Sequence, residues 1–286
     1  MRFSRATWMV PATVLILMSG AAALAPWISP QNVYHLESVR LADSSRPPAW
    51  IEAEDADPAS ERRFLLGADI QGRDILSATL FGLRVSLLVG TIGTLIAMAV
   101  GTALGLVAGY WRGWPESLIM RLADVQLSFP SILIAMFLMA LWGQGLMKII
   151  LAVAVVHWVI YARVVRGAVL AEREKDYITA VRALGCNAPR ILLRHLLPNL
   201  TTPVLVISAV EFGSVVMLEA TLSFLGLGVP ITRPSLGMLI KFGYDEFFNG
   251  AWWIWLFPGM ALVILILNLN WLADLLRLRL LPSGEG

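Results

Sequence analysis

Six long apolar segments alternate with short polar stretches along the 286 residues of the chain. An α-helix needs roughly 20 residues to cross the hydrocarbon core of a membrane, and each segment is at least that long. The pattern therefore predicts an all-α membrane protein with six transmembrane helices. The expected spans are residues 8–28, 83–110, 117–142, 146–170, 200–227 and 252–276, the third of them interrupted by Phe129 and Pro130.

The first apolar segment has two interpretations. It follows Arg2 and Arg5 and ends in Ala-Leu-Ala at Ala25, which is typical of a cleavable signal peptide. Pro26 would then stand directly after the cut, which is a poor geometry for a peptidase. Because further spans follow, we interpret residues 1–28 as an N-terminus and an uncleaved first transmembrane helix.

One extended hydrophilic region separates the first span from the second. It lacks a helical period, and we expect residues 29–82 to form a loop on the outer face. Its acidic residues are Glu37, Asp43, Glu52, Glu54, Asp55, Asp57 and Glu61, and it contains Pro47-Pro48.

Small residues recur every four positions in the second span. They are Gly93, Ala97, Gly101, Gly105 and Gly109. Inside lipid, a stripe without side chains lets another helix approach closely. We expect close helix packing there, while the pattern leaves the partner helix open.

The polar stretch at 171–199 is the only long interruption in the second half of the chain. Tyr177, Ala180, Val181 and Leu184 fall on one face of a short helix. Gly185 follows where a left-handed C-terminal cap is needed. Asn187 and Pro189 then restart a helix that runs through Ile191, Leu192 and His195, and Pro198 suits the boundary where the next helix begins. Such a short amphipathic helix with a fixed bend is well shaped to dock on another protein, although it also fits a plain connecting loop.

The distribution of positive charge predicts the orientation. Thirteen of the 22 basic residues lie on one face of the expected membrane: Arg2, Arg5, Arg112, Arg121, Arg163, Arg166, Arg173, Lys175, Arg182, Arg190, Arg194, Arg277 and Arg279. Short loops with excess Lys and Arg stay in the cytoplasm. We therefore expect both termini, the 171–199 loop and the tail 277–286 to be cytoplasmic, and residues 83–276 to form a five-helix membrane core.

Composition and motifs exclude most enzyme classes. The chain is 58% hydrophobic and carries one cysteine, Cys186, so it offers no disulfide framework and no cysteine-rich metal site. It contains no phosphate loop and no H-E-x-x-H or G-x-S-x-G motif, and the histidines at 35, 157 and 195 are scattered. We expect no catalytic residue, no metal site and no cofactor bound by this chain.

Carboxylates within the spans are the remaining candidates for function. Glu211 and Glu219 both lie in the fifth span, about 80° apart around the helix. A carboxylate in hydrocarbon usually faces a protein interior or a water-filled cavity. Together with Phe224, they are candidates for the pathway or its gating, while a structural hydrogen bond to a neighbouring helix is the alternative. His157, Asn268 and Asn270 are expected to bond between helices.

Several motifs in this order resemble one protein family. DYITAVRALG…RHLLPN resembles the EAA loop of bacterial ABC importer permeases. LGADIQGRDILSATLFGLRVSLLVG, the pair YAR and VRG at 161–167, and LEATLSFLGLGV at 218–229 resemble the C-type permease subunits of the dipeptide, oligopeptide and nickel transporters. The resemblance covers residues from about Phe64 to Asp274 and implies the type I ABC importer permease fold.

The resemblance also implies a mechanism and partners. The EAA-like loop would be the coupling helix that sits in a cleft of a cytoplasmic ATPase. The family motif matches Thr179, Ala180, Val181, Gly185, Leu197 and Pro198, with Asp176, Tyr177, Arg182 and Leu184 beside them. Implied partners are a second homologous permease, two ABC ATPases that bind ATP and Mg, an extracytoplasmic binding protein and membrane lipid, without nucleic acid.

The match to the family motif has two departures. Thr179 stands where the family usually has glutamate, and Val181 replaces an alanine. A charge pair made by that glutamate is therefore in doubt, and Asp176, one turn earlier, is a candidate substitute.

The function expected from these observations is a permease subunit of an ATP-driven importer for di- or oligopeptides in the bacterial inner membrane. His157-Trp158 resembles the nickel branch, so import of nickel, a metal chelate or an opine-like solute is an alternative. An intramembrane enzyme would need a catalytic pair beyond the two glutamates. The amphipathic 171–199 loop argues against a purely structural scaffold.

Overall fold

The computed structural model describes residues 5–34, 39–51 and 63–280, and of residues 5–7 only the backbone. Arg2, His35, Glu37, Glu52, Glu54, Asp55, Asp57 and Glu61, together with residues 281–286 of the expected tail, lie outside the described residues. The named elements of the described part are all helices, without a strand, which confirms the predicted all-α class.

Among the described residues, five helices are long and apolar enough to cross a membrane. They are α1 (Arg5–Ile28), α2 (Ile75–Trp111), α5 (Leu146–Glu172), α9 (Thr201–Phe224) and α11 (Trp253–Leu280). A sixth span exists only if α3 (Gly113–Leu127) and α4 (Ser131–Trp142), which are bent by 93° at their junction, are counted as one. The break at Phe129 and Pro130 is thus present, but the expected third span is an angled pair rather than an interrupted rod.

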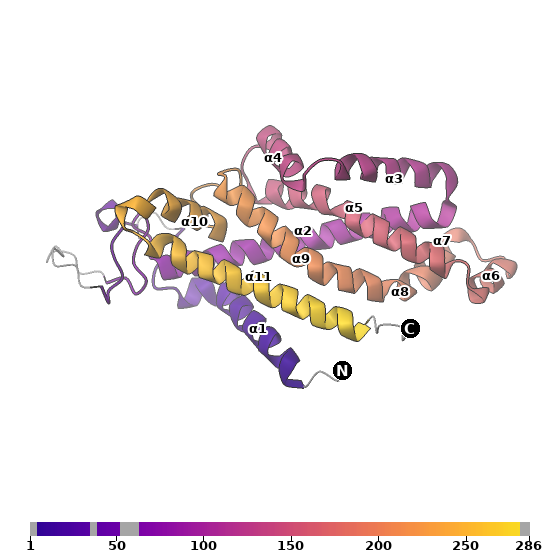
Figure 1. Ribbon diagram of the computed structural model, residues 1–286, viewed down its shortest axis with the longest axis horizontal. Helices are drawn as coiled ribbons and strands as arrows, with labels where there is room; N and C mark the ends of the chain where they lie inside the picture. The colour runs from indigo at the N-terminus through magenta and orange to yellow at the C-terminus, as the bar shows by residue number, and fades with distance from the viewer. Residues whose placement is uncertain (1–4, 35–38, 52–62, 281–286) are drawn as a thin grey trace.

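The shorter elements fill the two ends of the molecule. They are the 3₁₀ helices η2 (Leu41–Asp43) and η4 (Phe247–Asn249), the helices α6 (Asp176–Ala183), α7 (Ala188–Arg190), α8 (Leu197–Asn199) and α10 (Leu236–Asp245), and the π-helix η3 (Ile191–Leu196). In Figure 1, α6 lies at one end of the long axis and α10 at the other. The first turn of α1 and the last turn of α11 point toward the α6 end, as the predicted topology requires.

Helix α2 begins earlier than the sequence pattern indicates. The outer loop was expected to reach residue 82, whereas α2 starts at Ile75. The reason is a side-chain cap at Asp74, whose carboxylate accepts hydrogen bonds from the Ser77 amide at 2.8 Å and the Ser77 hydroxyl at 2.6 Å. Such a cap satisfies amide groups that otherwise have no partner in the first turn.

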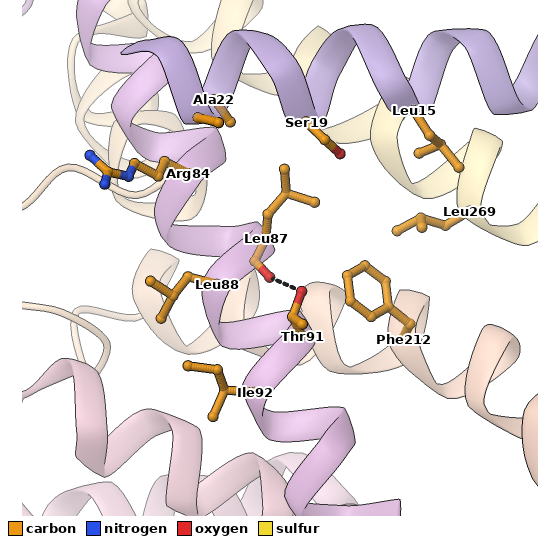
Figure 2. Close-up of a pocket in the computed structure, with 11 residues that line it drawn as sticks. Leu15, Ser19, Ala22, Arg84, Leu87, Leu88, Thr91, Ile92, Phe212 and Leu269 are labelled. Carbon is orange, nitrogen blue, oxygen red and sulfur yellow. Dashed lines mark hydrogen bonds between the residues drawn. The ribbon is translucent and has the colours of Figure 1, made fainter. Parts of the chain in front are cut away.

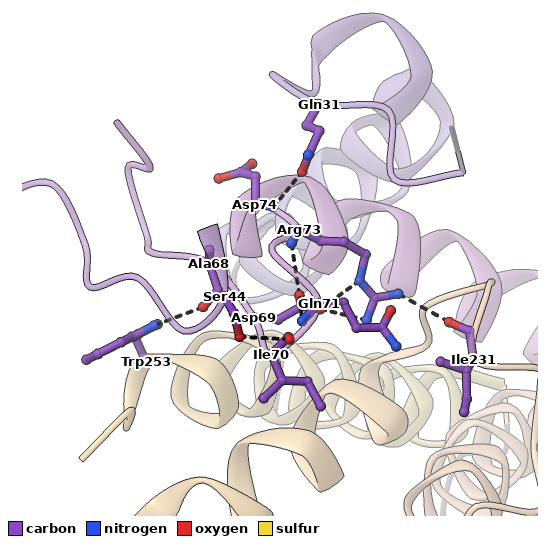
Figure 3. A network of polar contacts seen from close by, with 10 residues as sticks. All are labelled: Gln31, Ser44, Ala68, Asp69, Ile70, Gln71, Arg73, Asp74, Ile231 and Trp253. Atoms are coloured by element: carbon purple, nitrogen blue, oxygen red, sulfur yellow. Dashed lines mark hydrogen bonds and ion pairs between the residues drawn. The ribbon is translucent and has the colours of Figure 1, made fainter. Parts of the chain in front are cut away.

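A buried polar network holds the α10 end of the molecule together (Figure 3). The Asp69 carboxylate accepts from the Arg73 amide at 2.9 Å and from Arg73 Nε at 2.6 Å. Arg73 Nη1 also donates to the Ile231 carbonyl at 3.2 Å, and the Trp253 indole donates to the Ala68 carbonyl at 3.2 Å. The segment before α2 is therefore fastened both to the 225–235 connection and to the start of α11.

The stripe of small residues in α2 packs against α5. A Cβ at Gly101 would stand 2.3 Å from the Trp158 carbonyl oxygen, and one at Gly109 would stand 2.7 Å from Val169 Cβ. Gly93 and Gly105 meet α5 in the same way, and Ala97 between them is fully buried. The close packing predicted from the stripe is confirmed, and its partner helix is α5.

Helix α3 lies on α5 through a polar seam. Gln126 donates to the Val156 carbonyl at 2.8 Å and accepts from the Trp158 indole at 3.0 Å. Arg166 Nε donates to Glu116 at 2.7 Å, and Arg163 pairs with Asp124. The two arginines that the charge count placed on the inner face thus have acidic partners on α3.

The sequence pattern missed α10. This helix has only ten residues, and Pro230 and Pro234 precede it. It begins at Ser235, whose hydroxyl accepts from the Met238 amide at 3.4 Å. Gly237 lets α10 press against α9, since a Cβ there would stand 2.0 Å from the Ala220 carbonyl oxygen.

Candidate functional site

The segment 171–199 forms a compact layer at the end of the molecule opposite α10, which we call the α6 layer (Figure 1). Helix α6 ends with Gly185 in the left-handed region at φ +79°. The Gly185 amide donates to the Arg182 carbonyl at 2.9 Å and the Cys186 amide to the Val181 carbonyl at 3.3 Å, which is a Schellman cap. The Asn187 side chain then caps the next turn by accepting from the Arg190 amide at 3.2 Å. Both the bend and the helix restart follow the prediction.

Helix α6 has an inner and an outer face. Ile178 is fully buried and Val181 half-buried in a cluster with Val165, Ile191 and Leu196. The sequence analysis did not name Ile178, although it is the residue that anchors the helix. The 3.6-residue period pairs it with Val181 at i+3, which is the signal that would have found it.

The other members of the predicted stripe face outward. Tyr177 and Ala180 are exposed, and Leu184 is 81% exposed. Exposed apolar side chains gathered on one short helix mark a surface for a partner. The structure therefore divides the predicted stripe between three exposed residues and one inward residue, Val181.

Polar contacts fix α6 to its neighbours. The Tyr177 hydroxyl donates to Glu172 Oε1 at 2.6 Å and accepts from Asn199 Nδ2 at 3.0 Å, so it joins the end of α5 to α8. Lys175 Nζ lies 2.7 Å from Glu172 Oε2. Burial and the hydrogen bond to the Glu172 carboxylate raise the pKa of Tyr177, so its hydroxyl keeps its proton at neutral pH.

The α6 layer is also bound to the end of α2. Arg173 donates to the Gly109 carbonyl at 3.1 Å and to the Tyr110 carbonyl at 2.8 Å, which would otherwise lack partners at a helix C-terminus. The Arg182 guanidinium carbon stands 5.4 Å from the centroid of the Tyr110 ring, within the range of a cation–π contact. The α6 layer therefore contacts the ends of two long helices, α2 and α5.

The remaining coupling candidates lie on the rim of the layer. Asp176 and Thr179 are exposed on α6, Leu197 is half-buried and Pro198 is exposed in the first turn of α8. The substitution of Asp176 for the family's glutamate stays a prediction.

The two intramembrane glutamates do not share a site. Glu211 Oε2 lies 2.6 Å from Nδ1 of His157, which joins α9 to α5 as expected for that histidine. Glu219 is fully buried and accepts from the hydroxyl groups of Ser86 and Ser223, each at 2.7 Å. Each carboxylate thus has the geometry of a structural bond between helices.

Glu211 and Glu219 are absent from the lining of two cavities at the start of α2, which are described below. Phe224, the third candidate, contacts the Tyr244 ring edge-on with centroids 6.1 Å apart. Asn268 donates to the Ile264 carbonyl of its own helix at 2.7 Å, so the expected bond between helices is wrong for that residue.

Comparisons with known proteins place this geometry in context. A family model described as "Binding-protein-dependent transport system inner membrane component" matches residues 101–282. The Di/tripeptide transport system permease protein DppC of Pseudomonas aeruginosa is 36% identical over 94% of this chain and 86% of its own length. The Glutathione transport system permease protein GsiD of Pectobacterium atrosepticum is 38% identical over 76% of this chain and 72% of its own.

A solved structure supports the fold. The inward-facing MetNI methionine ABC transporter contains a chain that superposes with a TM-score of 0.56 at 19% identity, covering 68% of this chain and 93% of that one. At this identity the likeness concerns the fold alone.

Proposed function

The chain belongs to the family of binding-protein-dependent transport system inner membrane components, and from this premise we propose that its cargo is a di- or oligopeptide and that α6 receives the ATPase. It is a non-catalytic permease subunit of an ABC importer and a multi-pass protein of the inner membrane. Its partners include an ATPase and a substrate-binding protein.

The exposed stripe on a firmly held helix carries the coupling proposal. Leu184 and Ala180 offer apolar surface to a cleft, while Ile178 and the Tyr177 hydroxyl hold α6 to its own chain. An ATPase subunit that closes can move a membrane helix only if its contact with α6 is rigid. We propose that two ATPases, each binding ATP and Mg, dock on the pair of permeases. One ATPase contacts this chain and the other contacts a second homologous permease.

Orientation follows from the same proposal. The α6 layer, both termini and the 277–286 tail are cytoplasmic, and the network around Asp69 and Arg73 faces the outside, where the binding protein delivers cargo. The pathway lies between the two permeases, and ATP-driven closure exposes it to one side and then to the other. In this cycle the chain contributes the α6 surface that binds the ATPase and the rigid connection from α6 to the membrane helices.

A substitution at Ala180 tests the coupling proposal. We expect Ala180→Asp to abolish transport while each ATPase still binds nucleotide, because the charge would be buried in the docked cleft. Ala180→Ser, which preserves size and adds no charge, is the matched control. Substrate-stimulated ATP hydrolysis by the reconstituted complex is measured; equal stimulation in both variants would remove the coupling role from α6.

A second substitution tests the bend. Gly185→Val places a β-branched residue at φ +79°, which is strained whatever the space around it. We expect it to misorient α6 and uncouple hydrolysis from transport. Crosslinking from Arg182 to an ATPase subunit should fall in parallel.

The relatives named above favour a peptide cargo. The alternative cargo, nickel, rests on His157-Trp158 alone; in the structure His157 contacts Glu211 and the Trp158 indole donates to Gln126. Uptake by the complete system distinguishes the two, with a labelled dipeptide and with radioactive nickel as cargo. Uptake of nickel without uptake of peptide would overturn the cargo proposal and leave the coupling proposal standing.

A further inference from the structure

Two neighbouring cavities near the outer end share Arg84 and Leu88, and the second has the larger share of polar residues in its lining. The first, of about 620 Å³, is an apolar groove between α1, α2, α9 and α11. Its walls include Leu15, Leu87, Phe212 and Leu269. Figure 2 shows these side chains converging on the space between α1 and α2, with Arg84 at one edge and its guanidinium group directed away from them.

The second cavity, of about 490 Å³, is polar at the same edge. Tyr34, Arg84, Thr232 and Arg233 line it together with apolar residues of α2 and α5. Burial raises the pKa of Tyr34, and the positive charges of Arg84 and Arg233 oppose that rise. Both guanidinium groups are therefore close enough to act on one hydroxyl group.

The charges of the second cavity are unbalanced. Within the described part of the chain, no carboxylate forms an ion pair or a hydrogen bond with the side chain of Arg84 or Arg233. Arg73 nearby is different, since Asp69 satisfies it at 2.6 Å. Guanidinium groups without a carboxylate partner attract anions, because phosphate and carboxylate match their planar donors.

We propose that the two neighbouring cavities bind one anionic phospholipid, with its phosphate at Arg84 and Arg233 and an acyl chain in the groove between α1 and α2. The place in the membrane agrees with this assignment. Arg84 lies in the third turn of α2, counted from the outer end, where a span meets the headgroup region. Exposed Thr91 and Ile92 continue the groove toward the bilayer centre.

The apolar half decides between ligands of the same charge. A free phosphate or a peptide carboxylate would occupy the polar cavity and leave the groove at Leu15 and Phe212 without a partner. A phospholipid fills both halves with one molecule. The two halves can therefore be tested separately.

The polar half is tested with the double variant Arg84→Gln, Arg233→Gln. The complete transport complex is reconstituted in nanodiscs of phosphatidylglycerol and phosphatidylcholine, released into detergent, and its bound lipid is measured by native mass spectrometry. We expect the ratio of bound phosphatidylglycerol to phosphatidylcholine to fall about tenfold, as the loss of charge-assisted contacts predicts. Lys148→Gln removes an exposed cation of α5 that lines neither cavity, and should leave the ratio unchanged. An unchanged ratio in the double variant would overturn the proposal.

The apolar half is tested with Thr91→Trp, which fills the groove and keeps both arginines. The Thr91 hydroxyl bonds only to the Leu87 carbonyl of its own helix, so the change should not disturb the fold. We expect bound phosphatidylglycerol to fall here as well. Retention at the wild-type level would show a site for an anion alone, and a photocrosslinker at Thr91 that captures the second permease would show a protein interface. Either result overturns the lipid assignment, and neither touches the proposed cargo.

Discussion

The hydroxyl group of Tyr177 in α6 donates to the Glu172 carboxylate at the end of α5 over 2.6 Å and accepts from Asn199 in α8 at 3.0 Å. One side chain thus ties the coupling helix to the elements on both sides of it. A phenylalanine would keep the ring and remove both bonds. The contact of α6 with its own chain would then rest mainly on Ile178.

We expect Tyr177→Phe to lower substrate-stimulated ATP hydrolysis about fivefold without loss of assembly, because the two solvent-exposed hydrogen bonds that it removes together contribute about 1 kcal/mol. Tyr110→Phe is the control, since the ring that meets Arg182 remains. Hydrolysis is measured in the reconstituted complex, with and without loaded binding protein. Full stimulation in Tyr177→Phe would mean that the two hydrogen bonds of the Tyr177 hydroxyl have no part in coupling.

The glycine stripe makes a prediction about stability. Gly101→Ala should destabilise the protein by about 1–3 kcal/mol, since the new Cβ would meet the Trp158 carbonyl at 2.3 Å and force α2 away from α5. Gly167→Ala on α5 is the matched control because nothing lies within 4 Å of its Cβ. There the better helix propensity of alanine should leave stability equal or higher. Thermal unfolding in detergent distinguishes the two.

Glu219 is predicted to act through its acceptor oxygens. Glu219→Gln retains one acceptor, and the hydroxyl groups of Ser86 and Ser223 can rotate to receive its amide hydrogens. Glu219→Leu leaves both buried hydroxyl groups unsatisfied and should cost about 2–3 kcal/mol more. Melting temperatures of the purified complex compare the variants. Equal losses in both would indicate that the charge itself is needed.

Asp74 at the start of α2 gives a prediction about pH. Burial raises its pKa, although hydrogen bonds from Ser77 act in the opposite direction. A raised pKa in the folded state means that the protonated carboxyl stabilises the fold and that this contribution is lost as pH rises through that pKa. Asp74→Asn, which cannot ionise, should therefore match or exceed the wild type at neutral pH and lose the advantage in acid.

The matched variant Asp74→Ala removes the cap as well and should cost about 1 kcal/mol at every pH. Unfolding curves recorded from acid to neutral pH separate the two effects. If the stabilities of the wild type and of Asp74→Asn changed in parallel over that pH range, the raised pKa of Asp74 would be contradicted.

Local chemistry explains the parts of the fold that the sequence predicts well. The bend at Gly185 requires a positive φ that glycine alone adopts without strain, and Asn187 is a strong N-cap, so both could be read without the structure. The stripe from Gly93 to Gly109 likewise implies close packing from spacing alone. These features depend on residues near one another in the chain.

The misses depend on contacts between distant segments. Pro130 predicts a break, but the 93° angle between α3 and α4 depends on how α3 lies on α5 through Gln126 and Trp158. Helix periodicity predicted an apolar stripe on α6 but not which side of the helix faces the core, so the burial of Ile178 was not predicted. Short α10 has too few turns for periodicity to detect.

The length of α2 has a mechanical consequence. At 1.5 Å per residue its 37 residues extend about 55 Å, well beyond a hydrocarbon core of about 30 Å, and no proline interrupts them. Asp74 secures one extremity and Arg173 the other. The helix should therefore behave as a continuous shaft, so that spin labels placed at its two extremities keep a constant separation through the transport cycle while distances to the opposite permease change.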